Sequence, residues 1–186
     1  MTKEYLDIVD ENNNPTGKKE IRKEIHSSGL WHRTVHIYYF IKKDGEYYFL
    51  IHLRSKEKDL NPNMWDTRFG GHLQAGETTE KALLAELEEE IGIKANLKDF
   101  IKGLTNKRDS YPNNEFTYTF YYPGEEDISN LKFQDNEVQE VKWMSAKEII
   151  REANNNSSGW SAGLLEFESV YNFLISLKLK KNIKII

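Results

Sequence analysis

The amino-acid sequence predicts an α/β fold, a layer sandwich of helices on a mixed sheet. Six segments have the β-branched and aromatic composition of strands or lie between turns as strands do, and only three segments have a helical pattern. The helices do not follow the strands at the regular spacing of a parallel βαβ sheet. We therefore expect a sheet whose strands run in both directions.

The N-terminal half contains three of the strand candidates. Residues 5–9 form the first, and the turn-rich run at 10–17 ends it. The polar residues 18–26 form either a helical turn or an irregular arm. Residues 34–42 and 47–53 flank a short turn that contains Asp-Gly, which predicts a β-hairpin.

The C-terminal half begins with the clearest helix of the chain, at residues 78–91. Thr78 is a good N-cap residue, strong helix formers follow, and Gly92 marks the end. Further strands are expected at 97–105, 115–122 and 140–144, and further helices at 145–153 and 164–179.

Length and composition limit the possible classes of protein. A chain of 186 residues can bury a core, so we expect one domain over 1–186, with an N-terminal strand and arm up to residue 30 and a C-terminal helical region at 161–181. The absence of cysteine excludes disulfides, cysteine zinc sites and thiol catalysis. A net charge of -4 argues against a nucleic-acid partner. Without a signal region or a membrane span, we expect a cytoplasmic protein.

Three glutamates share one flank of the helix at 78–91. Glu86, Glu89 and Glu90 stand at i, i+3 and i+4, which places them within an arc of about 100°. Like charges at this spacing repel one another, but a bound hard cation reverses the penalty. Oxygen ligands favour Mg²⁺ or Mn²⁺. An ordinary solvated acidic face is the alternative, since such faces are common.

The residues before this helix make a metal site the better interpretation. Five residues separate Gly71 from Glu77, and the helix motif Ala-Glu-Leu-Glu-Glu-Glu-Ile-Gly follows at 85–92. This pattern resembles the Nudix box, which here covers the 23 residues 71–93. One position departs from it, because Ala85 stands where the box usually has arginine.

The resemblance implies an α/β/α sandwich with a loop-helix-loop catalytic box that binds Mg²⁺ or Mn²⁺. By position, Glu86 and Glu90 resemble direct metal ligands, and Glu89 resembles a ligand, direct or through water, with a catalytic role. Glu77 resembles the supporting glutamate, and a backbone carbonyl near Gly71 commonly joins the metal. Such enzymes cleave a diphosphate linkage of a small molecule by attack of a metal-activated water on phosphorus.

Two features of this site stay open. The arginine absent at Ala85 usually orients the box glutamates, and Lys81 or Arg68 could supply a cation instead. The acidic segment before the strand at 140–144 resembles the loop that often carries a further metal contact or the general base. Glu137 is the first candidate for this role, Asp135 the second and Glu140 the third, against the alternative of a merely solvated loop.

The region up to the start of the box carries all five histidines, with His72 as the second box residue, and resembles isopentenyl-diphosphate isomerase. The matching residues lie at 10–11, 17, 22–26, 29–33, 54, 58, 62, 65 and 71–72. The resemblance implies that His26, His32 and His72 help to bind a metal, with His72 also supporting the box. It further implies that cations at Arg22, Arg54 and Lys58 hold the substrate diphosphate. The alternatives are polar packing for the histidines and a charged loop for the cations.

One residue argues against the isomerase reaction itself. The catalytic cysteine of the isomerase corresponds to Gly70, so one of the two groups that this chemistry requires is absent. We therefore expect a hydrolase of nucleoside di- or triphosphates or of other organic diphosphates. The isomerase and a non-catalytic nucleotide-binding module remain the alternatives, and a homodimer is possible.

Overall fold

The computed structural model describes residues 4–58, 60–133, 137–161 and 163–182. Contacts between residues group the chain into two compact units. The first unit comprises Met1–Tyr38, Arg68–Pro123 and Asp127–Phe133, and the second comprises Tyr39–Thr67, Gly124–Glu126 and Gln134–Ile186. No helix among the described residues is both long and apolar enough to cross a membrane.

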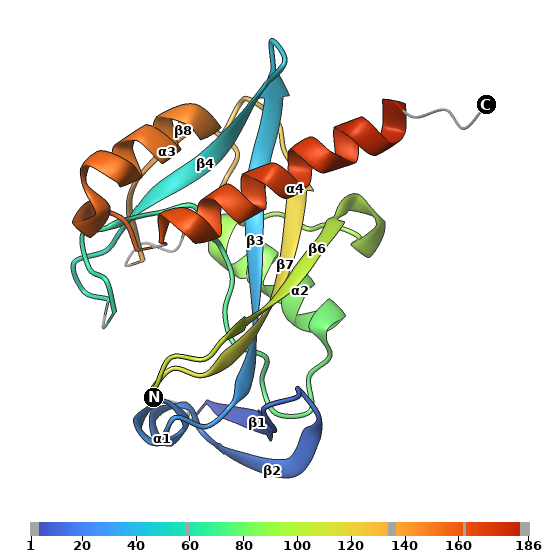
Figure 1. Ribbon diagram of the computed structural model, residues 1–186, viewed down its shortest axis with the longest axis vertical. Coiled ribbons are helices and arrows are strands. Elements are labelled where there is room, and N and C mark those ends of the chain that lie inside the picture. Colours follow the sequence, from blue (N-terminus) through green and yellow to red (C-terminus); the bar gives the residue numbers. More distant parts are fainter. Residues whose placement is uncertain (1–3, 59, 134–136, 162, 183–186) are drawn as a thin grey trace. The chain divides into compact units, whose positions relative to one another are not determined.

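The first unit contains a hairpin, two helices and one part of the sheet (Figure 1). Strand β1 (Tyr5–Val9) pairs antiparallel with β2 (Pro15–Ile21), and α1 (Arg22–Ser28) follows directly. The strand order in this part of the sheet is β3 (His32–Lys43), β7 (Glu115–Pro123) and β6 (Ile101–Arg108). Helix α2 (Thr79–Ile91) and the 3-10 turn Leu97–Asp99 complete the unit.

The second unit is organised around β4 (Glu46–Arg54). This strand pairs with the end of β3, where Phe40 faces Phe49, and with β5 (Trp65–Asp66) and β8 (Val138–Ser145). Helices α3 (Ala146–Asn155) and α4 (Leu164–Asn182) follow, with the 3-10 turn Ser157–Gly159 between them. The rings of Phe49 and Phe167 meet edge to face at 5.1 Å, so α4 packs on β4.

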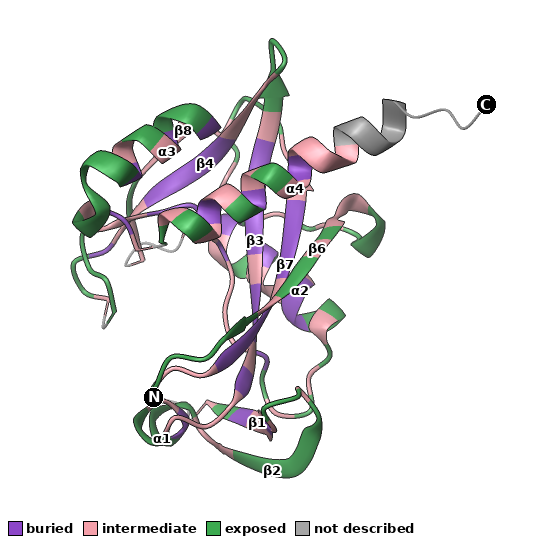
Figure 2. Ribbon diagram, in the orientation of Figure 1, coloured by how far each residue is buried: buried purple, intermediate pink, exposed green. Residues whose placement is uncertain are grey.

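Helix α2 is amphipathic as predicted, and its buried side fixes where its glutamates lie. Leu83, Leu87 and Ile91 are at most 1% exposed, whereas Glu88 and Glu89 are exposed (Figure 2). Burying three such side chains stabilises the fold by about 1.5–3 kcal/mol each. The apolar stripe therefore holds the acidic flank in one orientation.

Most predicted elements are confirmed, whereas β2, β5 and the start of β6 differ from the prediction. The hairpin at β3 and β4 and the three predicted helices are present. Strand β2 was not predicted, because its polar, mostly exposed residues lack the alternation of a half-buried strand. Strand β6 begins at Ile101 rather than at 97, because Asn96 and Asp99 form a capping box that turns the preceding residues into a 3-10 helix.

Candidate active site

Helix α2 carries the candidate metal ligands between two well-formed ends. The Thr78 hydroxyl accepts a hydrogen bond from the Lys81 N–H at 3.3 Å, and Gly92 ends the helix in the left-handed conformation at φ 76°. Glu86 and Glu90 are half-buried one turn apart, while Glu89 is exposed. Glu88 lies elsewhere on the helix and pairs with Lys94 at 3.2 Å.

A pair of glycines lies against two of these carboxylates. The backbone N–H of Gly70 donates a hydrogen bond to Glu90 Oε2 at 2.9 Å. A Cβ atom placed on Gly71 would lie only 2.3 Å from Glu86 Oε1, so the bare backbone is in contact with that carboxylate. The carbonyl oxygen of Gly71 accepts from the Val35 N–H at 2.9 Å and keeps a second lone pair.

These groups fit the divalent cation that the sequence implies. The donors of this carboxylate cluster, which we define as Glu86, Glu89 and Glu90, are oxygens, and hard cations such as Mg²⁺ and Mn²⁺ prefer oxygen. The backbone of Gly71 lies against this cluster, because a Cβ position on it is 2.3 Å from Glu86 Oε1. The structure thus brings Glu86, Glu90 and the Gly71 backbone together, with Glu89 on the exposed side of the same helix.

Glu77 hydrogen-bonds within the loop before α2, and Ala85 lies within the helix itself. The Glu77 carboxylate accepts from the Gln74 N–H at 3.0 Å, and the Glu77 N–H donates to the Gln74 carbonyl at 2.9 Å. Glu77 therefore closes the loop that leads into α2. Ala85 is half-buried and offers no charged group to the neighbouring glutamates.

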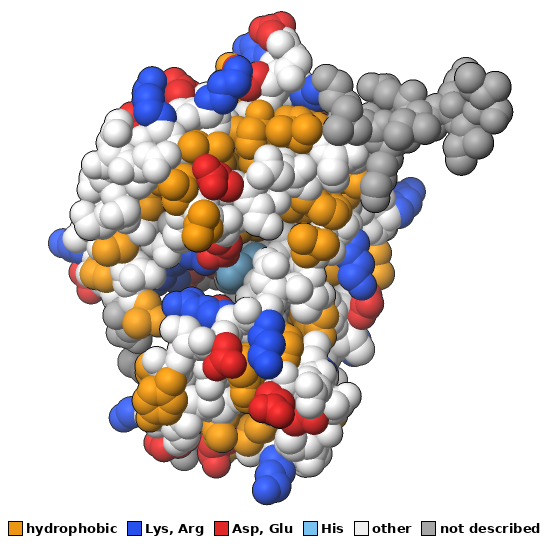
Figure 3. Space-filling model, in the orientation of Figure 1, with side chains coloured by type: hydrophobic (Ala, Val, Ile, Leu, Met, Phe, Trp, Pro, Cys, Tyr) orange, Lys and Arg blue, Asp and Glu red, His pale blue; other side chains and the backbone are white. Residues whose placement is uncertain are grey.

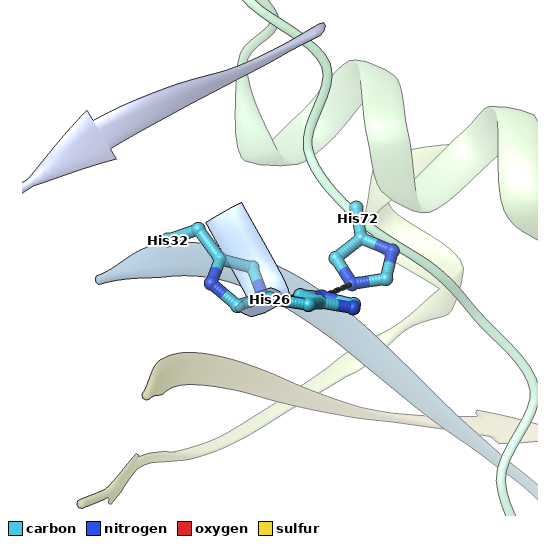
Figure 4. Close-up of side chains that lie close together, drawn as sticks. All are labelled: His26, His32 and His72. Carbon is cyan, nitrogen blue, oxygen red and sulfur yellow. Dashed lines mark hydrogen bonds between the residues drawn. The ribbon is translucent and has the colours of Figure 1, made fainter. Parts of the chain in front are cut away.

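The three predicted histidines converge in the first unit. The ring nitrogens of this histidine cluster, which comprises His26, His32 and His72, lie within 4.8 Å of one another. His26 Nε2 is 3.3 Å from His32 Nε2 and 3.2 Å from His72 Nε2 (Figure 4). Nitrogens bound at about 2.0–2.1 Å around a tetrahedral metal lie about 3.3–3.4 Å apart. The spacing suits a transition-metal ion.

Burial keeps these imidazoles in the neutral form that metals bind. It is the main cause that lowers the pKa of His26 to about 4, and it also lowers the pKa of His32 and of His72. The positive charge of Arg22 lowers the pKa of each histidine further. His32 Nδ1 lies 3.0 Å from the Leu30 carbonyl, which fixes the tautomer that leaves Nε2 free to accept a metal.

Sequence reasoning missed one acidic group beside this cluster. Glu115 at the start of β7 is 7% exposed, and its Oε2 lies 3.9 Å from His32 Nε2. Its other oxygen lies 3.6 Å from Arg108 Nη1. In the sequence, Glu115 is a lone carboxylate at the start of a strand rich in aromatic residues. Its position becomes informative only once the strand is known to face the histidines.

Arg22 lies in the first unit on the exposed side of α1. Its guanidinium pairs with Glu4 at 3.2 Å, and Glu4 Oε1 is also 3.9 Å from His72 Nδ1. The structure therefore places the first of the three candidate diphosphate-binding cations close to the histidine cluster.

The other two cations and the candidate base lie together in the second unit. The Arg54 guanidinium donates to the carbonyls of Leu60 and Asn61 at 3.0–3.3 Å and lies 3.6 Å from Asp66. Lys58 Nζ pairs with Glu137 Oε1 at 2.8 Å.

Glu140 and Asp135 are the alternative candidates for the general base. Glu140 is exposed and lies 3.6 Å from Lys142 Nζ, and Asp135 lies outside the described residues. Of the two described candidates for the base, Glu137 is the one whose cationic partner, Lys58, is itself a candidate substrate contact.

The surface shows no broad region of one charge on the face in Figure 3. Lys and Arg side chains alternate there with Asp and Glu side chains.

Comparison with known proteins identifies the family and the fold of this chain. The NUDIX domain family model matches residues 30–163. An uncharacterised Nudix hydrolase of Clostridium acetobutylicum is 32% identical over 188 residues, which cover 98% of this chain and 90% of the relative. An isopentenyl-diphosphate Delta-isomerase of Pectobacterium atrosepticum is 33% identical over 90 residues, which cover 48% of each chain.

The solved structures confirm the predicted α/β fold class. The crystal structure of DR0079 from Deinococcus radiodurans aligns with a TM-score of 0.67 over 91% of this chain and 99% of that chain, at 22% identity. This likeness shows the fold alone, whereas the family model and the Clostridium relative extend over most of the sequence. The chain therefore belongs to the family of the Nudix hydrolases.

Proposed function

We propose that this protein hydrolyses a diphosphate linkage in a nucleoside di- or triphosphate or in another organic diphosphate, with Mg²⁺ or Mn²⁺ as cofactor. The observation that carries the proposal is the contact of the Glu86 and Glu90 carboxylates with the backbone of Gly70 and Gly71. It brings the backbone of Gly70 and Gly71 against two half-buried carboxylates of one helix, and carboxylate oxygens are the donors that a hard cation prefers.

The residues of the carboxylate cluster have distinct parts in this proposal. Glu86 and Glu90 would hold the cation, and the exposed Glu89 would contact it directly or through water. The Gly71 carbonyl would be a further oxygen donor. When bound, the ion neutralises developing phosphoryl charge and lowers the pKa of its water.

The second unit supplies the proposed base and two substrate contacts. Glu137 is the proposed general base, and Lys58 holds its carboxylate in place through the 2.8 Å ion pair. Arg54 donates hydrogen bonds to two loop carbonyls. Its remaining N–H groups are the ones proposed to contact a phosphate. Arg22 contributes a third positive charge from the first unit.

A second metal site is proposed at the histidine cluster. The three neutral imidazoles favour a transition metal such as zinc over simple polar packing, since His26 Nε2 lies 3.2–3.3 Å from the Nε2 atoms of His32 and His72 and all three ring nitrogens lie within 4.8 Å of one another. The buried Glu115 carboxylate nearby provides negative charge that stabilises a bound cation.

Release of phosphate or pyrophosphate from a broad panel of nucleotides and organic diphosphates, with saturating Mg²⁺ or Mn²⁺, tests the proposal. Glu90→Gln should lower turnover about 100-fold or more, because it removes a negative ligand worth a few kcal/mol at the metal. Glu88→Gln is the matched control, since Glu88 is on the same helix but pairs with Lys94. Equal rates for the two variants would contradict the assigned chemistry.

The same panel separates the alternatives. A nucleotide-binding module would bind a nucleotide and leave it intact. An isomerase would convert isopentenyl diphosphate to dimethylallyl diphosphate, a reaction disfavoured by Gly70 in place of the cysteine. Detecting that conversion would overturn the hydrolase assignment.

A further inference from the structure

We propose that Gly70 is a positioning residue that orients Glu90 through its backbone N–H, and that no residue with a side chain can adopt its conformation. The inference rests on the proposed function of Glu90 as a metal ligand and assigns a specific role to the residue before the box. It is argued from the backbone of residues 69–71 and the groups in contact with it.

The backbone conformation at Gly70 is available only to glycine. Its φ is +131°, a region that L residues rarely adopt. A Cβ atom at this position would lie 2.1 Å from the carbonyl oxygen of Val35 and 3.0 Å from the Val35 carbonyl carbon. The obstacle is the main chain of β3, which cannot rotate away as a flexible side chain would.

Neighbouring hydrogen bonds prevent the segment from moving back from β3. The Val35 N–H donates to the Gly71 carbonyl at 2.9 Å. Ile37 and Phe69 exchange two hydrogen bonds, at 2.7 and 2.9 Å. Gly70 is therefore fixed to the strand on both sides, and relieving the contact with Val35 would break this pairing.

The conformation that excludes a side chain is also the one that presents the N–H to the carboxylate. The Gly70 N–H points at Glu90 Oε2 at 2.9 Å, and the next residue lies against the Glu86 carboxylate. Metal sites need their ligands held to about 0.5 Å. A displacement large enough to accommodate a Cβ would move both carboxylate contacts beyond that limit.

The backbone arrangement at Gly70 thus favours metal-dependent hydrolysis over the isomerase reaction. The position that corresponds to the isomerase cysteine cannot hold a thiol here, because its Cβ would meet the Val35 carbonyl. The same position instead holds a metal-binding carboxylate in place. We therefore expect that Gly70→Cys destroys metal binding without creating isomerase activity.

Gly70→Ala is the main test, and Gly76→Ala is its matched control. Gly76 also has a positive φ, +79°, but no atom lies within 4 Å of its Cβ position, so the control places alanine at a positive φ without a contact like that with Val35. Mn²⁺ affinity is measured by titration calorimetry, with folding checked by circular dichroism. Gly70→Ala should weaken Mn²⁺ binding about 10- to 100-fold relative to Gly76→Ala. Equal Mn²⁺ affinities in the two variants would overturn the proposal.

A measurement on the unchanged glycine keeps the proposal testable if Gly70→Ala does not fold. The Gly70 amide proton in the metal-free protein should shift upfield in Glu90→Gln, since its hydrogen bond to a charged acceptor is lost, and should not move in Glu88→Gln. An unchanged amide shift in Glu90→Gln would refute the contact. Neither readout depends on turnover, so lack of hydrolysis in the wild type would refute the proposed function without deciding this inference.

Discussion

Zinc binding by the histidine cluster is the prediction that the structure defines most closely. The perturbation is addition of Zn²⁺ to wild type and to His32→Gln, at a free concentration about 100 times the wild-type dissociation constant. A ligand that binds only the folded state at this ratio stabilises it by about 2.7 kcal/mol. In a chain of this length about 1 kcal/mol raises Tm by about 2–4 °C, so wild type should gain about 5–11 °C.

The geometry explains why a single substitution should remove this gain. His32 is fully buried, its Nδ1 is engaged with the Leu30 carbonyl, and its Nε2 is 3.3 Å from that of His26. Glutamine offers no comparable nitrogen donor, which leaves two ligands, too few for a stable site. The Zn²⁺-induced rise in Tm should then fall below about 2 °C.

Scanning calorimetry with and without Zn²⁺ gives the shift for each protein against its own metal-free Tm. His52→Gln is the control, because His52 is also buried but stands outside the cluster. Glu90→Gln tests whether zinc acts at the carboxylate cluster instead. If His32→Gln keeps the full shift, or Glu90→Gln abolishes it, the histidine cluster is not the zinc site.

Two other outcomes follow from the cluster and from the second unit. The metal-free protein should lose stability as pH falls from 6.5 towards 4, because folded His26, with its pKa of about 4, stays neutral while the unfolded chain takes up a proton. For this half-exposed ring the loss is on the order of 1–2 kcal/mol in urea unfolding, and His26→Gln should lose less. Lys58→Met should lower kcat/KM about tenfold, since it removes the partner of Glu137, while the free energy of unfolding changes by less than about 1 kcal/mol. Wild-type kcat/KM in Lys58→Met would show that Lys58 has no role in the reaction.

The features that the sequence predicted best are those set by local pattern. The caps at Thr78 and Gly92 and the leucine stripe define α2 within a single stretch, so the orientation of its glutamates follows without tertiary information. The histidine cluster lies across residues 26–72 and came from resemblance, because no periodicity relates positions so far apart. The N–H of Gly70 was beyond prediction, since it depends on a backbone angle and on pairing with β3.

Residues 70–72 connect two donor sets of different chemistry. Gly70 holds Glu90, Gly71 lies against Glu86, and His72 reaches His26 at 3.2 Å. Successive residues thus join a carboxylate cluster suited to Mg²⁺ or Mn²⁺ to an imidazole cluster suited to zinc. Mg²⁺ binds imidazole poorly, so it should still bind at the carboxylate cluster in His32→Gln. Zinc bound at the histidines should still hold residues 70–72 in place in Glu90→Gln. A change at either cluster that displaces the backbone of 70–72 should weaken both sites, and Gly70→Ala is the variant expected to do so.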